Sequence, residues 1–125
     1  FASLAFPREV QVRATLEAIT FEVRDVIDTV TQTSVATMKV DGGAAANDLL
    51  CQLQADLLGV PVERPRIVET TALGAAFMAG LGTGVWKDQD QLRATWREQR
   101  RFKPTADRAR VKEHLARWDA AVAKA

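Results

Sequence analysis

Apolar side chains recur at steps of three and four residues over the first quarter of the chain. They are Val12, Leu16, Ile19, Val23, Val26 and Val30. This spacing predicts a long amphipathic helix over about Arg8–Gln32, and Pro7 suits the first turn of such a helix. A coiled-coil seam has the same spacing, but about three heptads are short for one. We therefore expect this helix to pack on a sheet.

The next pattern, Thr37–Leu58, reads TMKVDGGAAANDLLCQLQADLL. A strand is expected over Val35–Val40, and the Asp-Gly-Gly sequence at 41–43 predicts a turn. An amphipathic helix then begins almost at once and runs to the end of this stretch, where Gly59 is expected as the C′ cap. The expected buried face of this helix consists of Leu49, Leu50, Leu53, Leu57 and Leu58.

Two further elements follow this helix. Residues Val60–Pro65 are typical of an extended segment, and their two prolines indicate an edge strand or a strand end. Two strands joined by a helix imply a right-handed crossover and a parallel pair. The segment Thr71–Leu81 predicts a helix of small residues, including Gly74 and Gly80. Since an interior glycine costs about 1 kcal/mol relative to alanine, we expect this helix to lie very close to a neighbour.

The last third of the chain is polar and basic. A polar helix is expected over Asp88–Glu98, a basic extended link over Arg100–Pro104 and a final amphipathic helix over Thr105–Lys124. Residues 87–125 carry 11 basic and 6 acidic side chains, whereas residues 1–86 carry 6 basic and 10 acidic ones. We therefore expect a basic helical extension over residues 87–125.

The composition indicates one globular domain over residues 1–125. Of the 125 residues, 47% are hydrophobic, which is enough for a core. No apolar run approaches the roughly 20 residues needed to span a bilayer, and no signal peptide is evident. The single cysteine, Cys51, excludes a disulfide framework and favours a cytoplasmic location. Because the first residue is Phe1, we expect the chain to be a piece of a longer protein.

The diglycine is the strongest candidate for chemistry. A glycine turn that leads into a helix leaves backbone N–H groups unpaired at the positive end of the helix dipole, which suits an anion or a phosphate. Asn47, expected on the first turn of the helix, is within reach of a ligand over Gly42 and Gly43. The motif is neither a Walker A loop nor G-x-G-x-x-G, so ordinary strand–helix packing is the alternative interpretation.

The other reactive residue types lack partners. His114 is best explained as a solvated helix residue and Cys51 as a small core or half-buried residue, while Asp41 either orients a metal-bound water or caps the turn or the helix start. A basic cluster interleaved with Trp96 and Phe102 either follows a nucleic-acid backbone or forms a solvated face or subunit contact, and we favour the second interpretation because of the helical spacing and the nearby acidic residues. The cluster consists of Arg93, Arg97, Arg100, Arg101 and Lys103. We assign no catalytic residue and no metal ligand.

The run VDGGAAANDLLCQLQADLLGVPVERPRIVETTALGAAFMAGLGTGVW, with the preceding RATLEAITFEVRDVID, resembles the C-terminal domain of glycerol kinases. These enzymes belong to the sugar-kinase (FGGY) branch of the actin/hexokinase-like ATPases. The tail WREQRRFKPTADRARVKEHLARWDAAV is similar to the family's usual ending, and ERP followed by ETTALGAA is more typical of glycerol kinases than of xylulose or gluconate kinases. The resemblance implies an α/β fold, namely a partial ribonuclease-H-like domain that is rich in helices and has a short parallel strand pair.

In that family the diglycine lies on the adenosine side of the ATP site. The resemblance implies that Gly43 contacts the nucleotide through its backbone and that Asn47 forms a hydrogen bond near the adenine. It also implies that Gly42 shapes the turn and that Ala44 lies against the nucleotide. The part of the nucleotide that contacts this segment is then mainly the adenosine rather than the triphosphate. The small-residue helix from Thr71 resembles the one that packs closely under this site.

The resemblance further implies transfer of the γ-phosphoryl group of ATP to glycerol, with Mg²⁺, by a dimer or tetramer. The family's phosphate-binding hairpin, glycerol-binding residues and catalytic aspartate belong upstream of Phe1, so we expect residues 1–125 alone to be inactive. The missing strands would leave an unpaired edge and apolar surface, which favours self-association of the piece. A kinase for another polyol or sugar and a non-enzymatic nucleotide-binding module are the alternatives.

Overall fold

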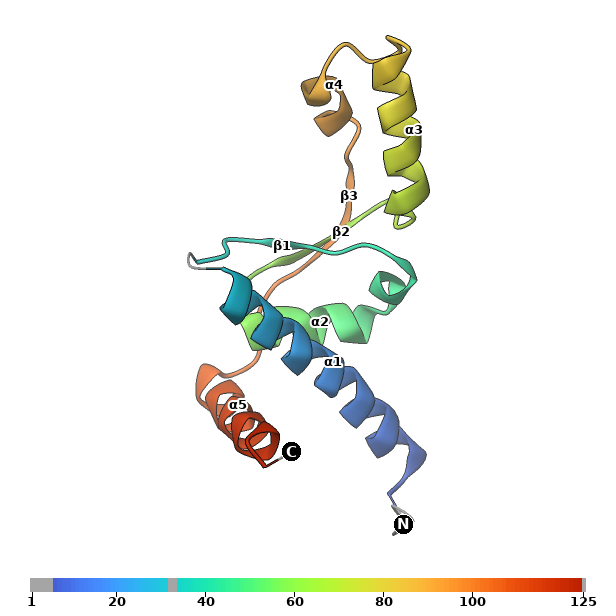
Figure 1. The fold of residues 1–125 in the computed structure, drawn as a ribbon. Helices are drawn as coiled ribbons and strands as arrows, with labels where there is room; N and C mark the ends of the chain where they lie inside the picture. Colours follow the sequence, from blue (N-terminus) through green and yellow to red (C-terminus); the bar gives the residue numbers. More distant parts are fainter. Residues whose placement is uncertain (1–5, 32–33, 125) are drawn as a thin grey trace.

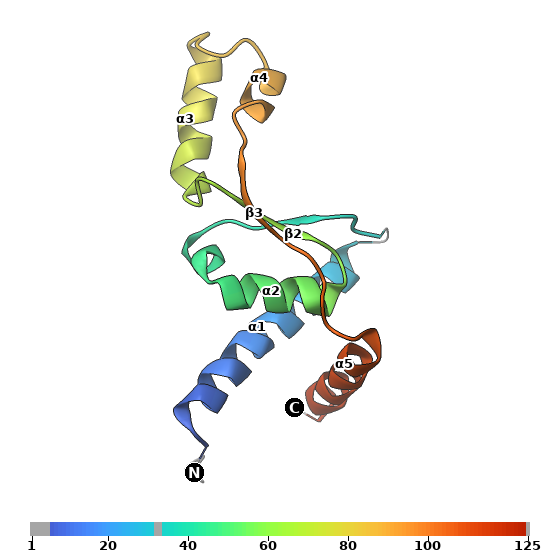
Figure 2. The same cartoon turned by 180° about the vertical axis from the view of Figure 1, so that it is seen from behind.

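The computed structural model describes residues 6–31 and 34–124. A small sheet lies at the centre, and three helices gather on one side of it: α1 (Arg8–Val30), α2 (Asp48–Leu58) and α5 (Arg108–Val122). The helices α3 (Thr70–Gly82) and α4 (Gln89–Arg93) form an arm that projects away from the sheet in the opposite direction (Figures 1 and 2). The described chain therefore consists of a helix-rich body and a helical arm joined by the sheet.

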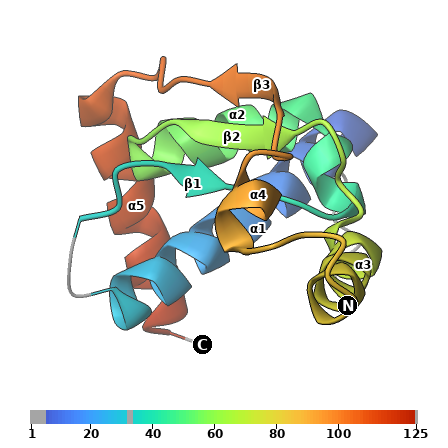
Figure 3. The same ribbon diagram turned by 90° about the horizontal axis from the view of Figure 1, so that it is seen from above.

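The sheet has three strands in the order β1 (Met38–Lys39), β2 (Val62–Pro65) and β3 (Glu98–Phe102). β1 runs parallel to β2, with Met38 opposite Val62, which confirms the predicted parallel pair. β3 runs antiparallel to β2, with Phe102 opposite Val62, so the sheet is mixed (Figure 3).

Of the two alternatives for Val60–Pro65, the edge strand is wrong and the strand end is correct, because Pro61 directly precedes β2 and Pro65 is its last residue. Among the described residues β2 is the middle strand, and β1 and β3 are the edges. Pro65 is tolerated there because it lies at a register shift between Arg64 and Pro65, where the regular ladder is interrupted. The strand β3 was not predicted, since its residues were assigned to a polar helix and to an extended link.

The core consists of two clusters that lie on two sides of α2. Between α2 and the sheet are Cys51, Ala55, Val62 and Phe102, each at most 2% exposed. Where α1, α2 and α5 meet are Phe21, Leu57 and Val111. The predicted leucine face of α2 is therefore only partly correct, because Leu49 is 43% exposed. The small side chains of Cys51 and Ala55 face the sheet instead, which allows the helix to approach β2 closely.

Helix α1 packs on α2, and not on the sheet as predicted. Its buried residues are Thr20 and Phe21, which lie beside the predicted stripe rather than within it. The Phe21 ring stacks on Trp118 of α5, with 5.0 Å between ring centroids. Four stripe residues are more than 40% exposed: Val12, Ile19, Val26 and Val30. The predicted end of this helix at Gln32 lies outside the described residues.

The prediction that the small-residue helix lies very close to a neighbour is confirmed at Gly80 of α3. A Cβ at Gly80 would lie 2.0 Å from the Trp86 ring, which packs edge-on against Phe77 at 5.3 Å. At Gly74, in contrast, the space around such a Cβ is open. The next helix, α4, ends at Arg93, five residues earlier than predicted, because the chain turns there into β3. Within the described part of the chain, no helix is both long and apolar enough to cross a membrane.

Candidate functional site

The diglycine follows β1 and adopts the backbone conformation that glycine allows. Gly42 has φ 79° and ψ 170°, in the region where side chains cause strain. Its N–H donates to the carbonyl of Val68 at 2.7 Å, which fixes the turn to the segment between β2 and α3. Gly43 is exposed, and a Cβ there would meet no atom within 4 Å. The turn therefore presents an open backbone surface at Gly43.

The helix begins soon after the diglycine, as predicted, but Asn47 does not lie on its first turn. A single 3₁₀ turn, η1 (Gly43–Ala46), comes first, and Asn47 is the N-cap of α2 rather than a residue of its first turn. The Asn47 Oδ1 atom accepts a hydrogen bond from the Leu50 N–H at 3.1 Å. Because the oxygen faces the helix, the Nδ2 amide is left as a donor toward solvent, without a partner among the described residues.

Two backbone donors lie next to this amide. The N–H groups of Gly43 and Ala44 begin η1 and have no hydrogen-bond partner in the described part of the chain. Both residues are exposed, and Ala45 is the one residue of η1 that is buried. The structure therefore brings Gly42, Gly43, Ala44 and Asn47 into one short exposed segment.

The start of α2 is already electrostatically compensated. Asp48, its first residue, pairs with Arg64 at 2.8 Å and also with Arg100. A carboxylate at this position and the Asn47 cap both satisfy the positive end of the helix. This arrangement weakens the interpretation of the helix start as a phosphate cradle, because a second anion would meet the Asp48 charge.

Arg64 is a buried residue that the sequence analysis did not select. Its side chain is 8% exposed. Besides Asp48, it donates to the carbonyl of Ala45 at 2.8 Å and to Gln99 Oε1 at 2.7 Å. One feature of the sequence indicates such a residue: Glu63 and Arg64 are adjacent charged residues within a short predicted strand. A charged side chain that is buried in a strand requires a partner.

Asp41 contacts the start of α3, and not the start of the helix after the diglycine that the capping interpretation proposed. It accepts a hydrogen bond from the Thr70 hydroxyl, at the first residue of α3. Its carboxylate is thereby directed at α3. In the described residues no group of three His, Cys, Asp or Glu side chains is placed to hold a metal ion. The residues present therefore do not fit a Mg²⁺ site, and we assign no metal ligand to this chain.

Cys51 is a core residue, as expected. It is 2% exposed, and its Sγ atom lies 3.2 Å from the Ala45 carbonyl, to which the thiol donates. Burial raises the pKa of the Cys51 thiol, although Arg64 opposes the effect. The thiol is therefore protonated at neutral pH and is unsuited to nucleophilic chemistry. His114 is half-buried beside a cavity between α1 and α5, away from the diglycine.

Three members of the basic cluster are paired with carboxylates. Arg93 pairs with Asp90, and Arg100 with Asp48. Arg101 pairs with both Glu63 and Glu98. These three members form an ion-paired surface over α4 and β3, which agrees with the solvated face that we favoured.

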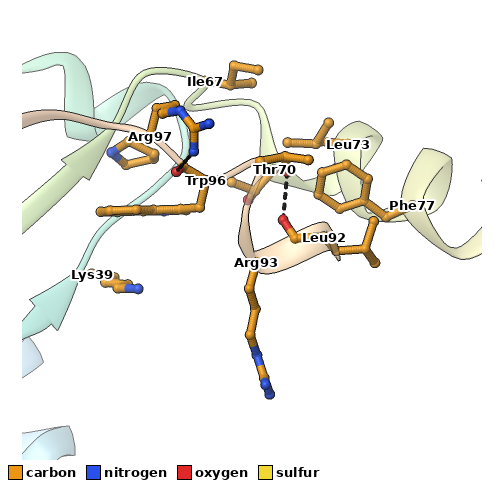
Figure 4. Close-up of a pocket in the computed structure, with 11 residues that line it drawn as sticks. Lys39, Ile67, Thr70, Leu73, Phe77, Leu92, Arg93, Trp96 and Arg97 are labelled. Carbon is orange, nitrogen blue, oxygen red and sulfur yellow. Dashed lines mark hydrogen bonds between the residues drawn. The ribbon is translucent and has the colours of Figure 1, made fainter. Parts of the chain in front are cut away.

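A cavity of about 450 Å³ lies between the ends of β1 and β2 and the arm. Figure 4 shows Trp96 on one side of it and Leu73 and Phe77 of α3 on the other. The Lys39 Nζ atom lies 4.2 Å from the centroid of the Trp96 ring. None of the four predicted site residues lines this cavity, although Thr70, which does, donates to Asp41 beside the diglycine.

Comparisons with known proteins identify the family. A profile of the C-terminal domain of the FGGY family of carbohydrate kinases matches residues 3–83. Glycerol kinase of Variovorax paradoxus is 50% identical over 120 residues, which cover 90% of this chain and 24% of that protein. Glycerol kinase of Pseudothermotoga lettingae is 49% identical and covers 94% of this chain. The chain thus spans about a quarter of the length of these curated relatives.

A solved structure supports the same assignment. The crystal structure of Plasmodium falciparum glycerol kinase with ADP aligns with a TM-score of 0.81 and 27% identity, and the alignment covers 99% of this chain and 26% of that one. The predicted ribonuclease-H-like class is confirmed by this likeness, with the addition of the antiparallel strand β3. The profile match, the relatives and the fold lead to one conclusion: the chain belongs to the FGGY family of carbohydrate kinases, in which it corresponds to the C-terminal domain.

Proposed function

We propose that the longer protein containing this chain is a glycerol kinase, which transfers the γ-phosphoryl group of ATP to glycerol and yields glycerol 3-phosphate. The observation that carries the proposal is the 50% identity to a glycerol kinase over 90% of this chain. The identity to the solved xylulose kinase of Lactobacillus acidophilus is 20%, at a TM-score of 0.74, which is evidence for the shared fold alone.

In this proposal the chain forms the adenosine-side wall of the ATP site. The unpaired N–H groups of Gly43 and Ala44 are donors for ribose or adenine acceptors. Asn47 Nδ2 adds a third donor, since its Oδ1 is engaged by Leu50. The absence of a Cβ at Gly43 allows a planar base to approach the backbone closely.

The chemistry itself is assigned to the rest of the protein. Phosphoryl transfer depends on positioning two substrates and on stabilising charge around the γ-phosphate, where Mg²⁺ supplies charge neutralisation when bound. In the described residues the start of α2 is already compensated by Asp48, and no group of three side chains is placed to hold a metal ion. Residues 1–125 alone are therefore expected to show no glycerol-dependent ATP turnover.

Three further features of the parent stay proposals: a dimeric or tetrameric assembly, a cytoplasmic location, and residues 87–125 as a basic extension of the domain. The alternatives are a kinase for another polyol or sugar and a non-enzymatic nucleotide-binding module. Substrate preference separates the first from glycerol kinase, and any turnover excludes the second.

The test uses the product of the complete reading frame that contains this chain. ADP formation from MgATP is followed with glycerol and with a panel of other polyols and sugars, in the wild type and in Asn47→Ala. Glycerol-specific turnover, with a higher KM for ATP in the variant, is the expected result. Turnover with another substrate would replace glycerol kinase by a related kinase, and absence of turnover with every substrate would refute a kinase function.

A further inference from the structure

Arg64 lies behind the diglycine segment and joins it to the sheet. From the middle strand β2, its 8%-exposed side chain reaches η1 and the start of α2. We propose that Arg64 is a positioning residue for nucleotide binding. Its buried side chain holds residues 43–48 in place, so that the exposed donors of Gly43 and Asn47 stay directed at the nucleotide. This inference rests on the function proposed above.

Each nitrogen of the Arg64 guanidinium has a different partner. Nη1 donates to the Ala45 carbonyl within η1 at 2.8 Å. Nη2 lies 2.8 Å from Oδ1 of Asp48, the first residue of α2. Nε donates to Oε1 of Gln99 in β3 at 2.7 Å. One planar group thus connects two strands with the turn and with the helix that follows it.

The hydrogen bond from Arg64 to the Ala45 carbonyl holds the buried side of η1. Ala45 is 4% exposed, whereas Ala44 and Ala46 on either side of it are exposed. The carbonyl of Ala45 has a second donor, the Cys51 thiol at 3.2 Å, but a thiol is a weak donor. Arg64 is therefore the principal group that holds η1 against the sheet, and the exposed residues of η1 take their position from this contact.

Replacement of Arg64 should loosen the turn more than it destabilises the sheet. The Asp48 carboxylate would keep Arg100 as its ion-pair partner. Arg100 also lies over the Phe102 ring, at 4.7 Å from the ring centroid, so this core ring keeps one guanidinium neighbour. The lost interactions would then be the hydrogen bonds to Ala45 and Gln99, the Arg64 half of the Asp48 pairing, and the contact of the guanidinium with the Phe102 ring at 5.3 Å. A lysine would preserve the charge but not the three diverging bonds.

The neighbouring ion pair offers a matched control. Arg101 pairs with Glu63, which precedes Arg64 in β2, and with Glu98. Arg64, in contrast, bonds to η1. Substitution of Arg101 removes an arginine from the same strand pair without touching the turn. Any effect that Arg64 and Arg101 variants share reflects the sheet, and any effect confined to Arg64 reflects the turn.

The experiment uses the product of the complete reading frame in five forms: wild type, Arg64→Lys, Arg64→Met, Arg101→Met and Asn47→Ala. Calorimetry gives the Kd for MgADP, and steady-state kinetics give KM for ATP and for glycerol separately, while thermal unfolding reports folding. We expect both Arg64 variants to bind ADP about tenfold or more weakly, the loss typical of a hydrogen bond to a charged group. The KM for glycerol and the Kd in Arg101→Met should equal those of the wild type.

Unchanged ADP affinity in Arg64→Lys would overturn the inference, as would a parallel rise in the KM for glycerol. If Arg64→Met does not fold, Arg64→Lys and Asp48→Asn give the answer, with a smaller loss expected in Asp48→Asn because it keeps the bond to Ala45. Wild-type protein that binds no ADP would refute the proposed function itself. Weak binding in Asn47→Ala together with normal binding in the Arg64 variants would refute the positioning role alone.

Discussion

The ring of Phe21 in α1 stacks on the ring of Trp118 in α5, with 5.0 Å between centroids and 10° between planes. The Trp118 Nε1–H also donates to Asp25 at 2.8 Å, one turn further along α1. One tryptophan therefore attaches the C-terminal helix to the N-terminal helix through both an apolar and a polar contact.

Trp118→Ala should detach α5 from the body. Loss of the stacked ring and of the hydrogen bond is expected to cost about 2–3 kcal/mol, somewhat below the range for fully buried aromatic residues, because Trp118 is only half-buried. Hydrogen exchange of the amides of α5 measures this local opening. Trp118→Phe keeps the stack and should show a smaller increase in exchange. Equal protection of α5 in the wild type and in Trp118→Ala would contradict the role of this contact.

The two glycines of the turn should respond differently to alanine. Gly42→Ala places a side chain at φ 79° and ψ 170°, a region that essentially only glycine occupies, and should lower the free energy of unfolding by about 1–3 kcal/mol. Gly43→Ala has open space and no such backbone conformation, so stability should be preserved while the methyl group obstructs the ligand face. Thermal unfolding and ADP titration separate the two effects. An intact ADP affinity in Gly43→Ala would contradict the proposed position of the nucleotide.

The arm offers a second glycine pair. Gly80→Ala would force its Cβ within 2.0 Å of Trp86, so the indole must move, and the fluorescence of this tryptophan should change together with a lower unfolding temperature. Gly74→Ala meets no atom within 4 Å and should stabilise α3 by about 1 kcal/mol through helix propensity. Destabilisation in both variants would mean that the contact of Gly80 with Trp86 has no special importance.

Cys51 should make stability depend on alkaline pH. Its pKa in the folded state is raised above the ordinary value of 9.0 because the thiol is buried. A raised pKa adds stability that is complete below about pH 9 and is lost as the pH rises through the folded value, because the unfolded thiol ionises first. The difference in the free energy of unfolding between the wild type and Cys51→Ala should therefore fall above about pH 9. A constant difference across this range would refute the effect.

The same burial predicts low reactivity. Alkylation of Cys51 by iodoacetamide at neutral pH, followed at the peptide level by mass spectrometry, should be slow in the native protein and fast after unfolding. Rapid native alkylation would show that the core around Ala45 and Val62 opens readily.

The elements that depend on local sequence were predicted well. The glycine turn and the C-terminal cap at Gly59, with φ 73°, follow from residue types that act within a few positions. The parallel pair β1–β2 follows from the order strand, helix, strand, which requires a crossover connection. The positions of Gly42 and Asn47 in one exposed segment also follow from their closeness in the chain. Residues that are adjacent in sequence need no tertiary information to be brought together.

What the sequence analysis missed depends on distant partners. The strand β3 has an exposed, charged pattern up to Phe102, so it is recognised only through its pairing with β2. Arg64 is buried because Ala45, 19 residues before it, and Gln99, 35 residues after it, both accept its hydrogen bonds. The face of α1 was misassigned because Phe21 lies off the regular apolar stripe and is buried by Trp118, which is far along the chain.

The central claim is that Asn47 donates to the nucleotide on the adenosine side of the ATP site. Its most direct test is calorimetric titration of MgADP into the complete protein, in the wild type and in Asn47→Ser. Serine is also a good N-cap, so this variant keeps the start of α2 and removes the outward Nδ2 donor. Our account predicts an unchanged unfolding temperature and ADP binding about tenfold weaker. Equal affinity in the two proteins would contradict it.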